Sequence, residues 1–163
     1  MKRILGLDVG DKTLGVAVSD ELGWTAQGLT VYQRSSLTAD MAFLRDTCAT
    51  YEVATIVVGL PKNMDGSLGP QAQKTLAFIE RVRQACGLPV TAWDERLTSQ
   101  AAERALLETN TSRRRRKAIR DRLAAQFILQ SYLDWQYRQR PSQATPEQLS
   151  ALDKGFAPEN DTA

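Results

Sequence analysis

Two short apolar segments open the chain, and they constrain its fold more than any other feature. They lie at residues 3–9 and 14–19, and a polar turn that contains Gly10 and Asp11 joins them. Successive side chains of a strand point to opposite faces, so strands that are apolar on both faces fit the interior of a covered sheet. The sequence therefore predicts an opening β-hairpin that lies in the middle of a sheet.

The remainder of the chain alternates between predicted strands and predicted helices. β-Branched or apolar runs indicate three more strands, at 29–33, 54–59 and 89–93. Apolar residues at helical spacing indicate four helices, one that begins after Ser36 and three over 70–86, 99–108 and 117–137. Three strands in a meander followed by strand–helix alternation predict an α/β fold, with a mixed five-stranded sheet and helices on its faces.

A change of composition near residue 139 divides the chain. Its 163 residues suit one globular domain. We expect that domain at residues 1–138 and a loose acidic tail at 139–163, which is rich in Pro, Ser, Ala and Thr.

The chain has no histidine, and this excludes several kinds of active site. Ser-His-Asp and Cys-His catalysis and histidine zinc sites all require an imidazole. The two cysteines, Cys48 and Cys86, form no C-x-x-C pair, so we expect small buried residues in a reducing compartment, not a disulfide or a zinc framework. With no apolar run of about 18 residues and no signal peptide, we expect a cytoplasmic protein without a membrane partner.

Positive charge is concentrated in one segment. The net charge is +2, but residues 96–122 carry nine basic and three acidic side chains, so this segment is +6 and the remainder −4. Five contiguous cations lie at its centre, at 113–117. Such a block indicates either contact with a polyanion or a solvated linker between helices, and composition alone favours neither.

Acidic residues interrupt apolar segments at unexpected places. Asp8 continues the first strand, where an unpaired charge costs several kcal/mol, so it either has a chemical role or bonds to the hairpin backbone. Asp94 and Glu95 end the strand at 89–93. Neighbours on a strand face opposite ways, so only one of them can share a site with Asp8, and alternation does not decide which. The alternative for this pair is an ion pair with Arg96 or a helix cap.

Asp121 lies on an otherwise apolar helical stripe, which continues through Ala124, Ala125, Ile128 and Tyr132. Its alternative role is the favourable interaction of an acid with the first turn of a helix. Three carboxylates in one place repel each other, and Mg²⁺ or Mn²⁺ resolves that repulsion because both prefer oxygen ligands. Without histidine as a base, metal-activated water is the natural nucleophile. Beside a basic segment, this chemistry predicts cleavage of phosphodiester bonds in nucleic acid.

Four motifs in order resemble the YqgF/RuvX family over residues 3–133. They are the opening hairpin at 4–20, the loop at 59–67, the DERLTS segment at 94–99, and Asp121 with the helix that follows it. The resemblance implies an RNase H-like fold related to Holliday-junction resolvases. It also implies a cytoplasmic bacterial nuclease acting on the 5′ end of pre-16S rRNA or on four-way DNA junctions. By position, Asp8, Glu95 and Asp121 would be the catalytic, metal-binding acids, with Asp94 as a candidate helper.

Nucleic acid is the expected partner, and basic and polar residues near the predicted site are the candidate contacts. The segment before Asp121 is more basic than is usual in the family, which we interpret as tighter phosphate contact. Lys62 and Asn63 lie on the central loop, where a plain surface turn at 63–66 is the alternative. Trp93, Trp24 and Tyr32 could stack on bases or pack internally. The full set of candidate contacts is Lys12, Lys62, Asn63, Arg96, Arg113, Arg114, Arg115, Arg116, Lys117 and Arg120.

Two other functions compete with a nuclease. Actin-like ATPases and sugar kinases share the D-x-G hairpin, but they need two such domains, and this chain has room for one. A non-catalytic RNA-binding assembly factor would keep the fold and the basic segment without turnover. A junction resolvase should be a homodimer, because the junction has two-fold symmetry and needs paired cuts, whereas an RNA-trimming enzyme need not be.

Overall fold

A computed structural model describes residues 3–98 and 112–140; within the last helix it does not describe the side chains of residues 113, 114 and 116–122. The strands are β1 (Arg3–Val9), β2 (Thr13–Ser19), β3 (Ala26–Gln33), β4 (Val53–Leu60) and β5 (Val90–Asp94). The helices are α1 (Leu37–Thr50), α2 (Pro70–Cys86), α4 (Arg113–Arg138) and the short 3₁₀ helix η1 (Glu95–Leu97).

The five strands form one mixed sheet in the order β3-β2-β1-β4-β5. The first three strands pair as an antiparallel meander. On the other side of β1, strands β4 and β5 continue the sheet in parallel. The predicted hairpin in the sheet interior and the predicted mixed sheet are therefore confirmed.

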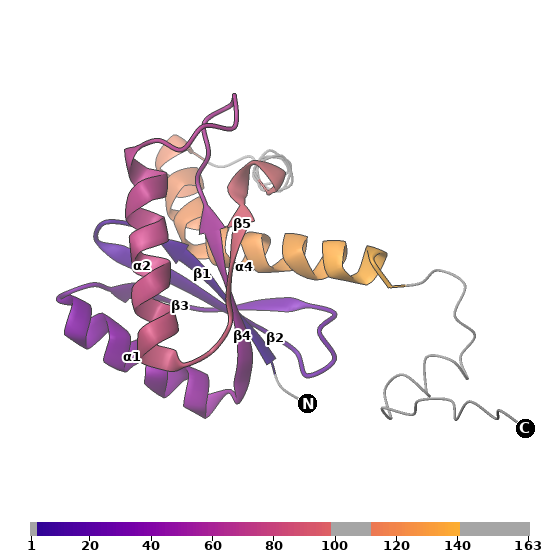
Figure 1. The fold of residues 1–163 in the computed structure, drawn as a ribbon. Helices are drawn as coiled ribbons and strands as arrows, with labels where there is room; N and C mark the ends of the chain where they lie inside the picture. Colours follow the sequence, from indigo (N-terminus) through magenta and orange to yellow (C-terminus); the bar gives the residue numbers. More distant parts are fainter. Residues whose placement is uncertain (1–2, 99–111, 141–163) are drawn as a thin grey trace, which may run out of the picture.

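Helices cover both faces of this sheet (Figure 1). Leu5 and Leu7 of β1 face the core that α1 and α2 complete, whereas Ile4 faces α4. This alternation follows from the period of two in a strand. Asp8 lies four residues after Ile4 in the same strand, so the same alternation places Asp8 on the face covered by α4.

α4 approaches the central strand very closely. A Cβ placed on Gly6 would lie 2.7 Å from the Cβ of Leu129 and 3.2 Å from the carbonyl oxygen of Ala125. Because Gly6 has no side chain and that of Ala125 is small, the helix backbone lies next to β1, as the alanines of this stripe predicted. α4 is thus held against the strand that carries Asp8.

Predicted helix ends agree well with the structure in α1 and α2. The Ser36 hydroxyl caps α1 by accepting from the Ala39 amide. α2 spans the predicted residues 70–86, begins at Pro70, and ends at Gly87 in the left-handed conformation (φ 64°).

α4 begins earlier than predicted, at Arg113 and not at Lys117. The linker interpretation of residues 113–116 was wrong for this reason: arginine is a good helix former, and these residues extend the helix. The predicted helix at 99–108 lies outside the described residues, and so does the predicted tail beyond residue 140.

Both cysteines are free thiols; Cys48 is buried as predicted, whereas Cys86, predicted to be buried as well, is only partly buried because it is the last residue of α2. A search of the described helices for a segment long and apolar enough to cross a membrane finds none.

Candidate active site

The candidate site lies at one edge of the sheet, where β1, β4 and β5 end. Asp8 is the penultimate residue of β1, and Glu95 directly follows β5. Leu7 pairs with Val58, and Gly59 pairs with Trp93, so Asp8 is level with Gly59 across the parallel half of the sheet. The two acids therefore flank the end of β4.

Gly59 provides the space in which Glu95 lies. A Cβ at Gly59 would be 2.7 Å from Oε1 of Glu95, 2.9 Å from its Cγ, and 2.5 Å from Cδ1 of Ile128 in α4. Any side chain at residue 59 would therefore collide with the Glu95 carboxyl or with the helix. Sequence reasoning missed this role, although a glycine at the end of a buried strand indicates close approach by another group.

The carboxyl groups of Asp8 and Glu95 contact each other through a hydrogen bond. Burial, followed by the charge of Asp8 and this hydrogen bond, raises the pKa of Glu95 to about 7; the charge of Asp94 acts in the same direction. A hydrogen bond between two carboxyl groups needs a proton on one of them. The pair therefore holds a proton near neutral pH or, when both groups are ionised, needs a cation beside it.

Asp94 points to a different partner. Its carboxylate accepts from the Arg96 amide at 3.0 Å and pairs with Nη2 of Arg96 at 2.7 Å. The guanidinium lowers the pKa of Asp94, and the charge of Lys62 contributes to the same effect. The two alternatives considered for Asp94 and Glu95 were an ion pair with Arg96 and a helix cap, and Asp94 makes both of these contacts. Glu95 is the acid that meets Asp8.

Arg96 connects the end of β5 to the central loop. Besides pairing with Asp94, its Nη1 donates to the carbonyl oxygens of Asn63 and Met64, both at 3.3 Å. The loop closes on itself through bonds from the Asn63 amide to the Ser67 carbonyl (3.0 Å) and from Asn63 Nδ2 to Ser67 Oγ (2.9 Å). Asn63 and Arg96 therefore hold this loop in place at the edge of the site.

The third predicted acid, Asp121, lies in α4 one turn before Ala125, and Ala125 contacts β1 at Gly6. Its side chain is among those not described. Among the side chains that are described, no group of three acidic or cysteine residues is placed to hold a metal ion. The structure thus brings together two of the three predicted acids and places the backbone of the third on the helix that covers them.

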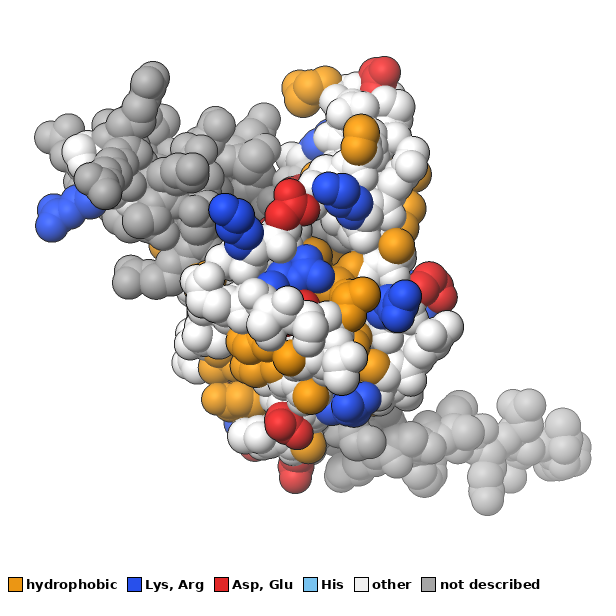
Figure 2. Space-filling view, turned by 90° about the vertical axis from the view of Figure 1, so that its left-hand side faces the viewer, with side chains coloured by type: hydrophobic (Ala, Val, Ile, Leu, Met, Phe, Trp, Pro, Cys, Tyr) orange, Lys and Arg blue, Asp and Glu red, His pale blue; other side chains and the backbone are white. Residues whose placement is uncertain are grey.

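The predicted nucleic-acid contacts are dispersed over several elements. Lys12 is exposed in the β1–β2 turn, Lys62 is half-buried on the central loop, and Arg115 is exposed in the first turn of α4. On the face shown in Figure 2, described basic side chains are interspersed with acidic and apolar ones. This face therefore presents no continuous basic surface among the described residues. The side chains of Arg113, Arg114, Arg116, Lys117 and Arg120 are not described.

The aromatic side chains considered for base stacking pack within the protein. Trp93 packs edge-on against Tyr132 with centroids 5.4 Å apart, and its Nε1 donates to Ser131 Oγ at 3.2 Å. Tyr32 stacks on Phe43 with centroids 4.0 Å apart. Trp24 contacts Tyr137 and stays half exposed.

This sheet order, with α4 on the face of the sheet to which Asp8 points, is that of an RNase H-like domain. The structure of RuvC from Thermus thermophilus in complex with a Holliday junction substrate has the same fold. It superimposes with a TM-score of 0.57 at 17% identity, covering 85% of this chain and 98% of that chain. A second Thermus thermophilus RuvC structure matches with a TM-score of 0.51 at 15% identity, covering 83% of this chain and 96% of that one. The predicted fold class is confirmed.

A protein-family model described as "RuvX: Holliday junction resolvase" matches residues 2–135, and the chain belongs to this family. Two relatives are both named "Putative pre-16S rRNA nuclease". One, from Moorella thermoacetica, is 58% identical over 132 residues, which are 81% of this chain and 94% of the relative. The other, from Desulforamulus reducens, is 54% identical over 132 residues, which are 81% of this chain and 96% of the relative. The family that the motifs indicated is confirmed.

Proposed function

We propose that this protein is a metal-dependent endonuclease that hydrolyses phosphodiester bonds in structured nucleic acid, with the 5′ end of pre-16S rRNA as its principal substrate. The observation that carries the proposal is the contact between the Asp8 and Glu95 carboxyls at the strand ends of an RNase H-like domain. The names of relatives that are more than half identical favour ribosomal RNA. A four-way DNA junction is the second substrate to test, because a RuvC of the same fold was solved with one.

The donor set suits a hard divalent cation. Asp8 and Glu95 offer only carboxylate oxygens, which Mg²⁺ and Mn²⁺ prefer, and their mutual repulsion is what a cation would relieve. Asp8 and Glu95 would hold the ion, with Asp121 as the third ligand and Asp94 outside this set because it pairs with Arg96. A bound ion of this kind supplies Lewis acidity toward phosphate and lowers the pKa of water.

The chain's own residues prepare the site for that chemistry. Glu95 gives up the proton that it shares with Asp8, so both acids become available as ligands near neutral pH. Gly59 leaves space for Glu95, and Ile128 of α4 packs against Gly59 beside it. The Asp94–Arg96 pair holds the central loop beside the site, where Lys62 can reach a substrate phosphate.

The basic start of α4 supplies the backbone contact in this proposal. Residues 113–117 bring five positive charges to the first turns of the helix whose next turns include Asp121. The N-terminus of a helix also favours anions through its unpaired amides and its dipole. If all five side chains contact duplex phosphates, the slope of log binding constant against log salt should reach about −4.5, at about −0.9 per phosphate.

A cleavage assay on both substrates tests the proposal. Labelled pre-16S rRNA 5′ leader and a four-way DNA junction are incubated with Mg²⁺, Mn²⁺ or chelator. We expect cation-dependent cleavage that leaves a 5′-phosphate and a 3′-hydroxyl, and its loss in Asp8→Asn. Asp11→Asn is the matched control, because Asp11 is an exposed acid three residues further on.

Two results would contradict the proposal. One is equal cleavage by the wild type and Asp8→Asn, which would assign the activity to a contaminant. The other is tight RNA binding without cleavage under any cation, which would favour the non-catalytic assembly factor. The junction would instead be the principal substrate if light scattering shows a dimer and the cleavage assay shows paired cuts in the junction.

A further inference from the structure

The two cysteines are far apart in sequence but meet between α1 and α2. Cys48 lies in the last turn of α1, and Cys86 is the last residue of α2. The thiols of Cys48 and Cys86 are close enough for a hydrogen-bond interaction that acts on the pKa of both. Cys48 is only 8% exposed and belongs to the core, whereas Cys86 packs against that core and is partly exposed. One sulfur is thus accessible, and a second sulfur is in contact with it.

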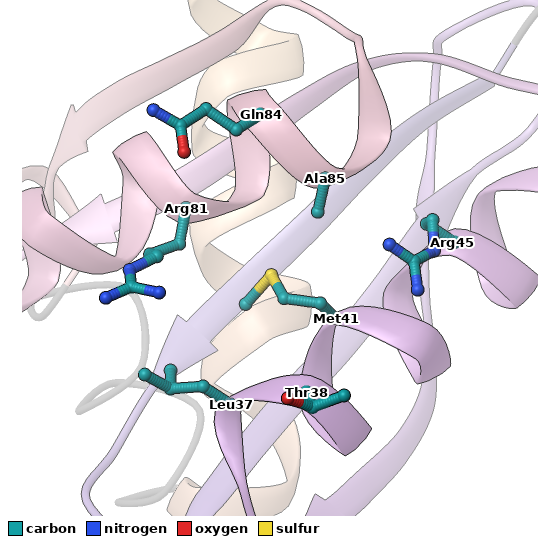
Figure 3. A pocket seen from close by; sticks show the side chains of 7 residues that line it. All are labelled: Leu37, Thr38, Met41, Arg45, Arg81, Gln84 and Ala85. Atoms are coloured by element: carbon teal, nitrogen blue, oxygen red, sulfur yellow. The ribbon is translucent and has the colours of Figure 1, made fainter.

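A basic side chain and an open groove lie next to this pair. Arg45 is one helical turn before Cys48, and its positive charge acts on Cys86. Figure 3 shows a groove between α1 and α2, with Arg45 and Met41 on one helix and Ala85 on the other. The groove has a volume of about 320 Å³, and one of its lining residues directly precedes Cys86. Cys86 itself is partly exposed, so a small oxidant can reach its sulfur.

We propose that Cys48 and Cys86 are a redox-active pair that closes into a reversible intramolecular disulfide when the protein meets a hydroperoxide. The Cys86 thiolate attacks one peroxide oxygen; an S–O bond forms, the O–O bond breaks, and the sulfur loses two electrons to the peroxide, which leaves as hydroxide or alkoxide. The Cys48 sulfur then attacks the sulfenic acid; the S–S bond forms, the S–O bond breaks, and the Cys48 proton leaves with the hydroxyl group as water.

The surroundings assign different roles to the two sulfurs. The hydrogen-bond interaction with Cys48, followed by the charge of Arg45, lowers the pKa of Cys86 to about 7 against the opposing effect of burial. The same interaction, together with burial, raises the pKa of Cys48. An attacking thiol is most effective when its pKa is close to the ambient pH. Cys86 is also the more exposed of the two, whereas Cys48 is buried in the core, so Cys86 is the attacking residue and Cys48 the resolving residue.

The disulfide would stabilise the fold without changing the carboxylate pair. Cys48 precedes β4 and Cys86 precedes β5, so both lie near the starts of these strands, while Asp8 is the penultimate residue of β1 and Glu95 directly follows β5. The bond would close a loop that contains β4 and most of α2. For a loop of this length we expect the melting temperature to rise by about 10 °C. The inference does not depend on the proposed nuclease function, because its readouts are covalent and thermal.

The test uses the full chain, reduced with dithiothreitol, desalted, and treated with a small molar excess of hydrogen peroxide. We expect the intact mass to fall by two hydrogens and non-reducing peptide maps to link the peptides of Cys48 and Cys86. We also expect the higher melting temperature to revert with dithiothreitol. Arg45→Gln should slow the reaction several-fold, since the thiolate loses its cation.

Cysteine variants separate the two steps. Cys86→Ser should show neither the link nor the thermal shift. Cys48→Ser should accumulate a sulfenic acid at Cys86 that dimedone traps. The proposal is overturned if both thiols of the wild type still react with iodoacetamide after oxidation, if the only disulfides join separate chains, or if Cys48→Ser yields no dimedone adduct.

Discussion

Replacing Glu95 with glutamine should stabilise the metal-free protein at alkaline pH while abolishing cleavage. Burial and the charge of Asp8 raise the pKa of Glu95 from its ordinary 4.5 to about 7. Below pH 4.5, Glu95 is protonated in both the folded and the unfolded state. Between pH 4.5 and about pH 7 only the folded state keeps the proton, so the free energy of unfolding falls as pH rises. This loss of stability is complete above pH 7. Glutamine stays neutral throughout and avoids this loss.

The magnitude follows from the difference between the two pKa values. At about 1.4 kcal/mol per pKa unit, the shift from 4.5 to about 7 corresponds to at most about 3.5 kcal/mol above pH 7. Some solvent reaches Glu95, so we expect about 2 kcal/mol. For a domain of this size, the melting temperature of Glu95→Gln at pH 8 should exceed that of the wild type by about 5 °C.

Thermal melts in EDTA between pH 5 and pH 8.5 provide the measurement. The curves of melting temperature should coincide near pH 5 and diverge as pH rises. Asp94→Asn is the matched control, because Arg96 lowers the pKa of this neighbouring acid. The stability that Asp94 contributes is present above its unfolded pKa, so Asp94→Asn should melt below the wild type at every pH from 5 to 8.5.

The reasoning fails if Glu95→Gln melts at or below the wild-type temperature at pH 8. It also fails if the two curves run parallel over the whole range, since Glu95 would then titrate equally in the folded and unfolded states.

Three further changes test other parts of the site. Gly59→Ala should cost about 1–3 kcal/mol in urea unfolding and remove cleavage, because the added methyl collides with Glu95 and Ile128; unchanged activity would show that Glu95 does not need this space. Mn²⁺ should raise the melting temperature of the wild type by at least several degrees but leave Asp8→Asn nearly unchanged, since the variant loses a ligand; an equal rise in both proteins would place the ion elsewhere. Arg96→Ala should accelerate proteolysis within residues 61–69, since two hydrogen bonds from Arg96 to carbonyl oxygens of the loop are lost. An unchanged rate of proteolysis would mean that the hydrogen bonds within the loop are sufficient to hold its conformation.

The sequence was sufficient for most of the fold because its signals are local. The opening hairpin, the cap at Ser36 and the helix from Pro70 to Gly87 depend on patterning and on terminal residues, and all three are observed. The start of α4 was placed too late because a run of arginines indicates solvation as strongly as it indicates helix. A charged run carries no apolar periodicity from which a boundary could be read.

The candidate site was predictable only in part, because its geometry depends on neighbours in space. Apolar strands interrupted by acids indicated Asp8 and the pair at the end of β5. Strand alternation could not choose between Asp94 and Glu95, because η1 begins at that point and a helical turn replaces the period of two. The choice depends on Arg96, which pairs with one acid, and on Gly59, which makes room for the other.

The carboxylate pair is assembled from strands that are far apart in the sequence. Asp8 is near the start of the chain, but it meets Glu95 only after β4 has paired with β1 and β5 has paired with β4. Under the proposed function, a chain that translation has not yet carried past residue 95 therefore has no complete acid pair at this site.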